Sequence, residues 1–285
     1  MPRATIAALD VYPIKGCRGI ALATARVAVR GLLAAMPDAV AGDREWMVVD
    51  RDGRFVTQRE YPRLALIETS LAAGALVLHA PGMAPLALSL GDAGAPVREV
   101  VVWHSRVPAR DAGDEACRWF SGVLDADVRL VRFDPAHERR CNPDYAGDSG
   151  AHTAFADGYP LLVIGEASLA DLNTRLAAKG LPALPMNRFR PNLVLAGLDP
   201  YDEDHVSSIV SEGVTLKLVK PCTRCQVTAT DQNTARVGLE PLATLGGYRN
   251  NAALAGVAFG MNAIVVSGAG QALNVGASVD CTLAF

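Results

Sequence analysis

Short apolar segments, recurring about every ten residues between glycines, prolines and Asp-Gly, constrain the fold of this chain most strongly. In the first hundred residues they occupy 5–12, 22–29, 46–50, 54–58, 64–69, 76–79, 86–90 and 97–102. Asp52-Gly53 separates two of them and is typical of a tight hairpin turn, because glycine accepts a positive φ. Short strands at this spacing predict a barrel or a sandwich.

The second half of the chain combines further strand patterns with helical ones. Residues 114–120 and 168–178 carry apolar side chains near helical spacing, and Gly180 ends the second segment. Ser168 and Asp171 resemble a capping box, so we expect that helix to begin at Ser168. Residues 134–153 are polar and contain several prolines and glycines, which predicts a long loop. Strands are predicted at residues 128–133, 159–164, 189–195, 213–219, 226–230, 263–267 and 278–283.

Length and composition exclude several classes of protein. A chain of 285 residues suggests roughly two domains. Its 27 basic and 30 acidic residues nearly balance, which argues against a general nucleic-acid binder. No apolar run approaches the roughly 18 residues of a membrane-spanning helix, and the N-terminus lacks the apolar stretch of a secretory signal. We therefore expect a cytoplasmic protein without a membrane partner, whose six cysteines are thiols.

A Cys-x-x-Cys motif lies within the densest cluster of chemically capable side chains, at residues 220–231. The thiols of Cys222 and Cys225 can both reach one ion, but a structural zinc site needs four ligands and the sequence has no second pair. A thioredoxin-like redox pair would begin a helix, whereas the following residues resemble a strand. Two buried thiols without a role are the third interpretation, which the neighbouring Lys, Arg and Thr side chains disfavour.

Three other clusters combine cations with turn residues. Lys15 and Gly16 follow the first predicted strand, where backbone N–H groups and an ammonium can hold a phosphate. Arg44 lies in a charged run before a strand, and Arg190 opens an apolar strand, where a guanidinium can bind a phosphate through two hydrogen bonds. Solvated charge or a surface ion pair also explains each cluster taken alone. The sequence has no P-loop, Gly-x-Gly-x-x-Gly, Gly-x-Ser-x-Gly or His-Glu-x-x-His motif.

Taken together and in this order, the clusters resemble the MOSC family in its two-part form, and within it the mitochondrial amidoxime-reducing component and bacterial YcbX-type proteins. The matching stretches span nearly the whole chain, at residues 12–19, 43–62, 159–175, 187–197, 221–231, 240–249, 259–260 and 273–276. The resemblance implies a β-dominated α+β fold. An N-terminal β-barrel-like domain would cover residues 1–105, and a MOSC β-barrel with a few flanking helices would cover 106–285, with a linker or lid at about 134–153.

The resemblance also implies a molybdenum cofactor, in which the dithiolene of a phosphate-bearing pterin holds the metal. The second cysteine of the motif ligates molybdenum in the family, and that position is Cys225 here. A thiolate is a soft donor that suits a metal already bound through sulfur. Cys222 would then lie nearby or merely pack. The positions that match cofactor contacts in the family are Lys15, Gly16, Arg44, Asp157, Gly158, Arg190, Asn192, Thr223 and Arg224.

Two of these positions depart from the family's pattern. Relatives often carry a hydroxyl side chain where this chain has Gly158, and a serine where it has Gly16. Gly16 can offer only its backbone N–H group, and at Gly158 the hydroxyl contact is lost. These departures concern individual contacts and leave the predicted site in place.

The activity that the resemblance implies is reduction of the N–O bond of N-hydroxylated substrates: amidoximes, hydroxamates and N-hydroxylated nucleobases. Asp231 is the candidate proton donor, with a turn or capping role as its commoner explanation. The chain ends at Phe285 without the iron–sulfur domain of some relatives, so electrons are expected from a separate ferredoxin- or flavin-type reductase. Two alternatives stay open: a cofactor or sulfur carrier without turnover, and a binding module with a zinc or dithiol site.

Overall fold

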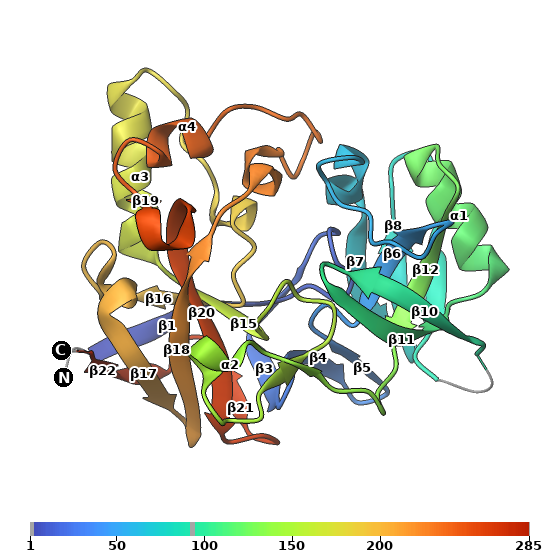
Figure 1. Ribbon diagram of the computed structural model, residues 1–285, viewed down its shortest axis with the longest axis horizontal. Helices are drawn as coiled ribbons and strands as arrows, with labels where there is room; N and C mark the ends of the chain where they lie inside the picture. Colours follow the sequence, from blue (N-terminus) through green and yellow to red (C-terminus); the bar gives the residue numbers. More distant parts are fainter. Residues whose placement is uncertain (1–2, 92–94, 285) are drawn as a thin grey trace.

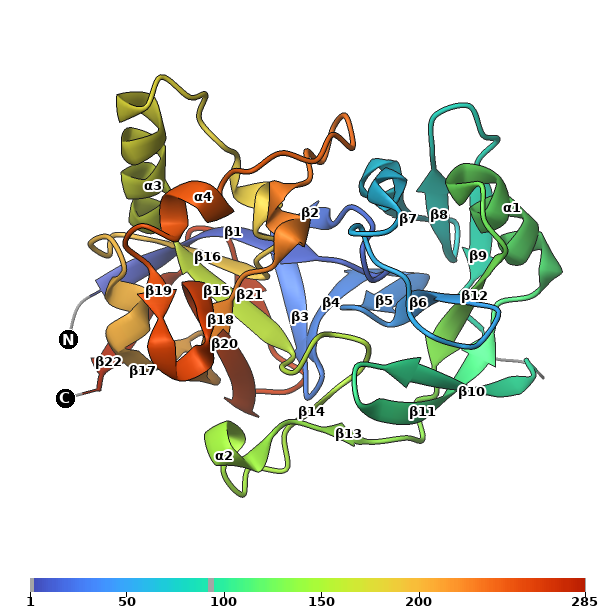
Figure 2. The same ribbon diagram turned by 45° about the horizontal axis from the view of Figure 1, so that its top comes forward.

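Strands dominate the structure, a computed structural model that describes residues 3–91 and 95–284 (Figure 1). Strands account for 44% of the structure and helices for 18%, which confirms the predicted β-dominated α+β class. The strands form a closed seven-stranded barrel and a half-barrel. The two lobes lie side by side in both views (Figures 1 and 2). The expectation of β-barrel architecture with a few flanking helices is therefore confirmed.

The closed barrel is antiparallel apart from one parallel pair. Its strands follow the order β15 (Leu161–Gly165), β16 (Leu193–Ala196), β1 (Arg3–Val11), β22 (Ser278–Leu283), β17 (Val206–Ser211), β18 (Val214–Thr223) and β20 (Gly256–Ser267), and β20 closes the ring by pairing with β15. β15 and β16 are parallel because helix α3 (Glu166–Ala178) forms the crossover between them. The interior is filled by buried aliphatic side chains from all seven strands.

The remaining strands extend the barrel or form smaller antiparallel sheets. β2 (Ile20–Leu22) extends β1, and β19 (Asn250–Asn251) extends β20. The smaller sheets have the orders β10 (Val97–Val102), β11 (Ser105–Asp111), β12 (Val128–Phe133), β6 (Trp46–Asp50); β21 (Ala272–Asn274), β3 (Thr24–Ala28), β4 (Gly31–Met36), β5 (Ala39–Gly42); β7 (Glu68–Ala72), β8 (Ala75–His79), β9 (Leu86–Ser89); and β13 (Arg139–Arg140), β14 (His152–Thr153).

Short helices flank these sheets. Besides α3, the described residues form α1 (Asp114–Leu124), α2 (Pro143–Ala146), α4 (Leu242–Leu245) and the 3-10 helices η1 (Pro62–Leu66), η2 (Met186–Arg188), η3 (Asp202–His205), η4 (Gln226–Ala229) and η5 (Ala252–Leu254). The helical pattern predicted at 114–120 is confirmed by α1, whose Trp119, Phe120 and Val123 pack into the core of the half-barrel lobe. Within the described residues, no helix has the length and apolarity needed to cross a membrane.

The two ends of the chain share one barrel. β1 pairs with β16 and with β22, so the first strand lies between two strands from the second half of the sequence. In the other direction, β21 pairs with β3, and β12 pairs with β6. Strand pairs therefore cross residue 105 in both directions, and the boundary at that residue stays a prediction.

Two strand predictions are wrong, and the strand predicted at 54–58 is reduced to isolated bridges at Arg54 and Phe55. The stretch predicted at 226–230 is the 3-10 helix η4, and much of the stretch predicted at 64–69 belongs to η1. Threonine favours strands, but the backbone N–H and the hydroxyl of Thr228 both donate to the carbonyl of Cys225, which stabilises a local turn instead. Pro62 begins η1, where its fixed φ suits the first helical turn.

The predicted capping box of α3 is also wrong. The helix begins at Glu166, two residues before Ser168, with Gly165 as its N-cap. Ser168 is buried, and its hydroxyl donates to the Glu203 carboxylate across 2.7 Å. The same carboxylate accepts the N–H of Gly165 across 3.1 Å. A carboxylate distant in sequence therefore holds the start of the helix through Gly165 and Ser168, and local spacing cannot reveal this contact.

Gly260 is placed where β20 closes the barrel against β15. Its φ is +77°, and a Cβ atom there would lie 2.6 Å from Cγ1 of Ile164 and 2.8 Å from the carbonyl oxygen of Val163. We expect Gly260→Ala to lower the free energy of unfolding by about 2–4 kcal/mol, from left-handed strain plus overpacking. Urea denaturation measures this change.

Gly276→Ala is the matched control for that substitution. Gly276 has a similar φ of +88°, but a Cβ atom there meets nothing within 4 Å. We expect this variant to lose only the conformational part, about 1–2 kcal/mol. Equal losses in the two variants would show that the close approach of β20 to β15 does not require glycine.

Candidate functional site

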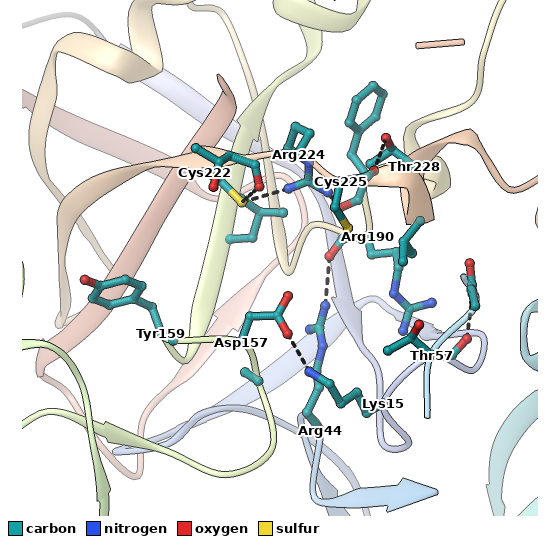
Figure 3. Close-up of a pocket in the computed structure, with 18 of the residues that line it drawn as sticks. Lys15, Arg44, Thr57, Asp157, Tyr159, Arg190, Cys222, Arg224, Cys225 and Thr228 are labelled. Carbon is teal, nitrogen blue, oxygen red and sulfur yellow. Dashed lines mark hydrogen bonds and ion pairs between the residues drawn. The ribbon is translucent and has the colours of Figure 1, made fainter. Parts of the chain in front are cut away.

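A cleft where the half-barrel lobe meets the barrel gathers side chains from distant parts of the chain (Figure 3). The cleft is open to solvent, and its empty volume with the open mouth included is about 970 Å³. Every residue predicted to contact the cofactor lines this cleft: Lys15, Gly16, Arg44, Asp157, Gly158, Arg190, Asn192, Thr223, Arg224 and Cys225. The structure brings these residues together, while their individual roles stay predictions.

Three cations, Lys15, Arg44 and Arg190, are largely buried in the cleft and form its floor. Arg44 and Arg190 have left-handed backbone φ values of 48° and 57°, which are uncommon for residues other than glycine. Their guanidinium carbons each lie 4.3 Å from the centre of the Tyr12 ring, just after β1. Strained backbone of this kind is found mainly at ligand-binding and active sites, and here both strained residues place a cation against one aromatic ring.

The charge of Arg44 is compensated within the protein. Its Nη1 donates to both carboxylate oxygens of Asp43, across 2.7 and 2.6 Å. Asn192 completes this buried network, because its Nδ2 donates to Asp43 and its Oδ1 accepts from Arg44. The backbone N–H of Tyr12 also donates to Asp43. Arg44 is therefore held in one orientation before any ligand arrives.

Arg190 lacks such compensation. Its buried Nη2 has no hydrogen-bond partner among the described residues. Burial, reinforced by the nearby charge of Arg44, lowers the pKa of Arg190 to about 10, so it is still protonated at neutral pH. An unpaired buried N–H and two like charges side by side both cost stability. An anion in the cleft would offset this excess positive charge.

Lys15 is linked to the cleft mouth through Asp157. Its Nζ donates to the carbonyl of Phe155 across 2.9 Å and to Oδ1 of Asp157 across 2.5 Å. The same carboxylate oxygen accepts the indole N–H of Trp103 across 2.9 Å. Burial lowers the pKa of Lys15, and the Asp157 carboxylate partly offsets this effect. The ammonium and the carboxylate thus connect the floor of the cleft to its rim.

The segment 134–153 supports the cleft from outside. The predicted long loop contains the short elements β13, α2 and β14, and none of its residues lines the cleft. Arg139 in β13 donates to the carbonyl groups of Ala154, Ala156 and Asp157. A buried guanidinium that binds three carbonyl groups of one backbone stretch fixes the turn that carries Asp157. This segment therefore supports the turn that carries Asp157. None of its described residues covers the cleft.

The Cys-x-x-Cys motif forms the opposite wall (Figure 3). Cys222 lies near the end of β18, and the exposed, unpaired Cys225 is the residue before η4. Arg224 turns its guanidinium toward Cys222 Sγ, across 2.9 Å, and toward the carbonyl of Phe189, across 2.6 Å. Cys222 is thus held by a hydrogen bond, whereas the Cys225 thiol is free to contact a ligand. No group of three or more potential metal-ligating side chains occurs within the described residues.

Asp231 does not line the cleft. Its Oδ2 accepts from Nη2 of Arg188 across 2.9 Å, and its Oδ1 accepts the backbone N–H groups of Asn233 and Thr234. Burial alone would raise the pKa of Asp231, but the amides of Asn233 and Thr234 and the charge of Arg188 hold it below its usual value. The structure places Asp231 in a turn and an ion pair, which is its commoner role.

Several residues that line the cleft were not singled out from the sequence. They come from the stretch after β6, from the turn between β10 and β11, from the residue after η2 and from β20: Phe55, Thr57, Gln58, Arg59, Trp103, Phe189 and Asn262. Residues 55–59 lie inside a quoted family stretch, so a signal existed for the segment but not for individual side chains. Trp103 carried no sequence signal, because it follows an ordinary strand pattern.

Comparison with known proteins identifies the family. Residues 3–127 match the model of the MOSC N-terminal beta barrel domain, and residues 150–280 match that of the MOSC domain. Mitochondrial amidoxime reducing component 2 of Bos taurus is 34% identical over 250 residues, which cover 86% of this chain and 72% of the relative. Mitochondrial amidoxime-reducing component 1 of Homo sapiens is 35% identical over 251 residues, with 86% and 72% covered.

A longer relative matches over a similar stretch. Molybdenum cofactor sulfurase of Oryza sativa subsp. japonica is 33% identical over 258 residues, which cover 84% of this chain but only 30% of the relative. The likeness to the amidoxime-reducing components covers more than two thirds of each chain compared. With its N-terminal barrel module and its MOSC module, the chain belongs to the MOSC family in its two-part form.

Proposed function

We propose that this chain is a molybdenum-cofactor-dependent oxidoreductase that reduces the N–O bond of N-hydroxylated compounds. One observation carries the proposal: a free, exposed thiol, Cys225, shares a cleft with a buried cationic floor in which Arg190 lacks an acceptor. The names of the relatives support it, since they describe amidoxime reduction and the molybdenum cofactor.

The cleft residues fit a group that carries both a phosphate and a metal held through sulfur. Lys15 and Arg190 line the cleft and offer positive charge to a phosphate. Arg224 and the backbone at Gly16 and Thr223 line the cleft and offer polar contacts to a pterin. The Asn192 amide is fully hydrogen-bonded within the protein, so it contributes by orienting Arg44. Cys225 offers one soft thiolate, which is enough for a metal that brings its own sulfur ligands. When bound, the cofactor supplies the two-electron redox chemistry of the reaction.

The stoichiometry of amidoxime reduction defines the tasks that the protein itself must perform. An amidoxime takes up two electrons and two protons, its N–O bond breaks, and an amidine and water leave. The protein must therefore keep the cofactor in place, leave the Cys225 side of the cleft open to the substrate and admit an electron donor. We propose that a separate electron-transfer protein of the ferredoxin or flavin type supplies the electrons, as the solvent exposure of Cys225 allows.

A second candidate function is a cofactor or sulfur carrier without turnover. The observation that favours it is the 33% identity to a plant molybdenum cofactor sulfurase. A carrier would use the same cationic floor and the same thiol. It would release its cargo reversibly, and it would leave N-hydroxylated compounds unchanged.

The test is elemental analysis of the purified chain combined with turnover of benzamidoxime by a reduced viologen dye. We expect about one molybdenum per chain, because the proposed site has a single thiolate ligand. We also expect benzamidine to form. Molybdenum without benzamidine formation would support the carrier. Zinc in place of molybdenum would contradict both candidates and favour a binding module.

A further inference from the structure

Trp103 occupies a position that does not suit its residue type. It is the first residue of the two-residue turn between β10 and β11, and its φ is +55°. Glycine and asparagine are favoured at such turn positions, since a Cβ atom is strained there. Trp103 is 42% exposed, whereas the other two tryptophans, Trp46 and Trp119, are 2% and 7% exposed. A large aromatic side chain kept exposed on a strained turn indicates a role other than packing.

The orientation of the Trp103 ring is fixed by three neighbours. Its indole N–H donates to Asp157 Oδ1 across 2.9 Å. The Phe55 ring lies 5.0 Å away, between centroids, at an angle of 55°. The guanidinium of Arg59 lies over the indole, 5.4 Å from its centroid. All four side chains line the cleft, so the exposed part of the indole is held as a preorganised surface within it.

The aromatic group and the cationic floor differ in their exposure to solvent. Lys15, Arg44 and Arg190 are largely buried, whereas Trp103, Arg59 and Cys225 are exposed. A ligand with a phosphate is attracted to the floor, where the positive charge lies. A second molecule that enters from solvent toward Cys225 meets the rim first. The indole is therefore placed to contact the substrate rather than the anionic end of the cofactor.

We propose that Trp103, supported by Phe55 and Arg59, is a stacking surface that makes the site prefer planar, delocalised N-hydroxylated compounds. Aromatic amidoximes and N-hydroxylated nucleobases have such a π-face, and small aliphatic hydroxamates do not. Stacking of a planar base on an aromatic side chain accounts for about a tenfold or larger gain in affinity. The identity of the substrates rests on the proposed function, whereas the stacking contact itself does not require turnover.

The experiment measures binding with the full chain by calorimetry, using benzamidoxime and acetohydroxamate as probes. Trp103→Leu is expected to weaken benzamidoxime binding about tenfold and to change acetohydroxamate binding less than about twofold. Trp103→Phe keeps an aromatic face without the N–H, so most of the affinity should remain. Quenching of the emission of Trp103 by benzamidoxime gives a second readout, since the other two tryptophans are buried.

His104→Ala is the matched control, because His104 is the neighbouring exposed turn residue and does not line the cleft. It should bind both probes as the unaltered chain does. Equal weakening of both probes in Trp103→Leu, or unchanged benzamidoxime binding, would overturn the stacking proposal. Stacking without reduction of benzamidoxime would overturn only the proposed function, so the two failures are distinguishable.

Discussion

Replacing Cys225 with alanine is expected to lower both the molybdenum content and the rate of benzamidoxime reduction by more than about a hundredfold. Loss of an outer partner of a metal ligand already costs about 10–100-fold, and Cys225 is the proposed ligand itself. Its thiol is exposed and forms no disulfide in the cleft, so its removal breaks no covalent link among the described residues. Elemental analysis, turnover and the absorption bands of thiolate ligation measure the change.

Cys222→Ala is the control that separates ligation from the mere presence of a thiol. Cys222 lines the same cleft, but its sulfur accepts a hydrogen bond from Arg224. We expect this variant to retain its molybdenum and to keep its activity within about threefold, the cost of one modest hydrogen bond. If Cys222→Ala were the more damaging substitution, the ligand assignment would have to move to Cys222.

The sequence predicted most of the architecture because strand patterning is local. The stretches at 97–102, 128–133 and 278–283 match β10, β12 and β22, each bounded by turn residues. The stretch at 226–230 failed because a threonine run has the propensity of a strand and also the hydroxyls that stabilise a local turn. The pairing of β1 with β22 joins opposite ends of the chain, and no local pattern carries that information.

The candidate site also contains residues that the sequence could identify and residues that it could not. Lys15, Arg44, Arg190 and Cys225 belong to short motifs whose order along the chain resembles a known family, so sequence alone could gather them. Asp231 shows the limit of sequence patterns: its role as a proton donor stays a prediction, and the ion pair of its carboxylate with Arg188 could not be read from the sequence. Two further features cannot be read from the sequence: which cation lacks a hydrogen-bond partner, and which aromatic residue lines the cleft. Both depend on residues far away in the chain.

Arg190→Gln is expected to weaken binding of inorganic phosphate about 10–100-fold, because hydrogen bonds to charged groups contribute about 1.5–3 kcal/mol. The molybdenum retained after gel filtration should fall with it. Calorimetric titration with phosphate measures the first effect, and elemental analysis measures the second. Arg63→Gln, at an exposed arginine outside the cleft lining, should change neither quantity.

The free energy of unfolding of Arg190→Gln is the stronger test, because we expect little or no loss of stability where a loss is usual. Substitution of a buried arginine ordinarily destabilises a protein by removing its partners, but Nη2 of Arg190 has no partner among the described residues and Arg44 lies nearby. The uncharged side chain relieves that repulsion while losing the contact with the Tyr12 ring. We therefore expect the ligand-free variant to unfold within about 1 kcal/mol of the unaltered chain, or at higher urea. Marked destabilisation with unchanged phosphate affinity would mean that Arg190 serves the fold, and the anion-binding floor would then reduce to Lys15 and Arg44.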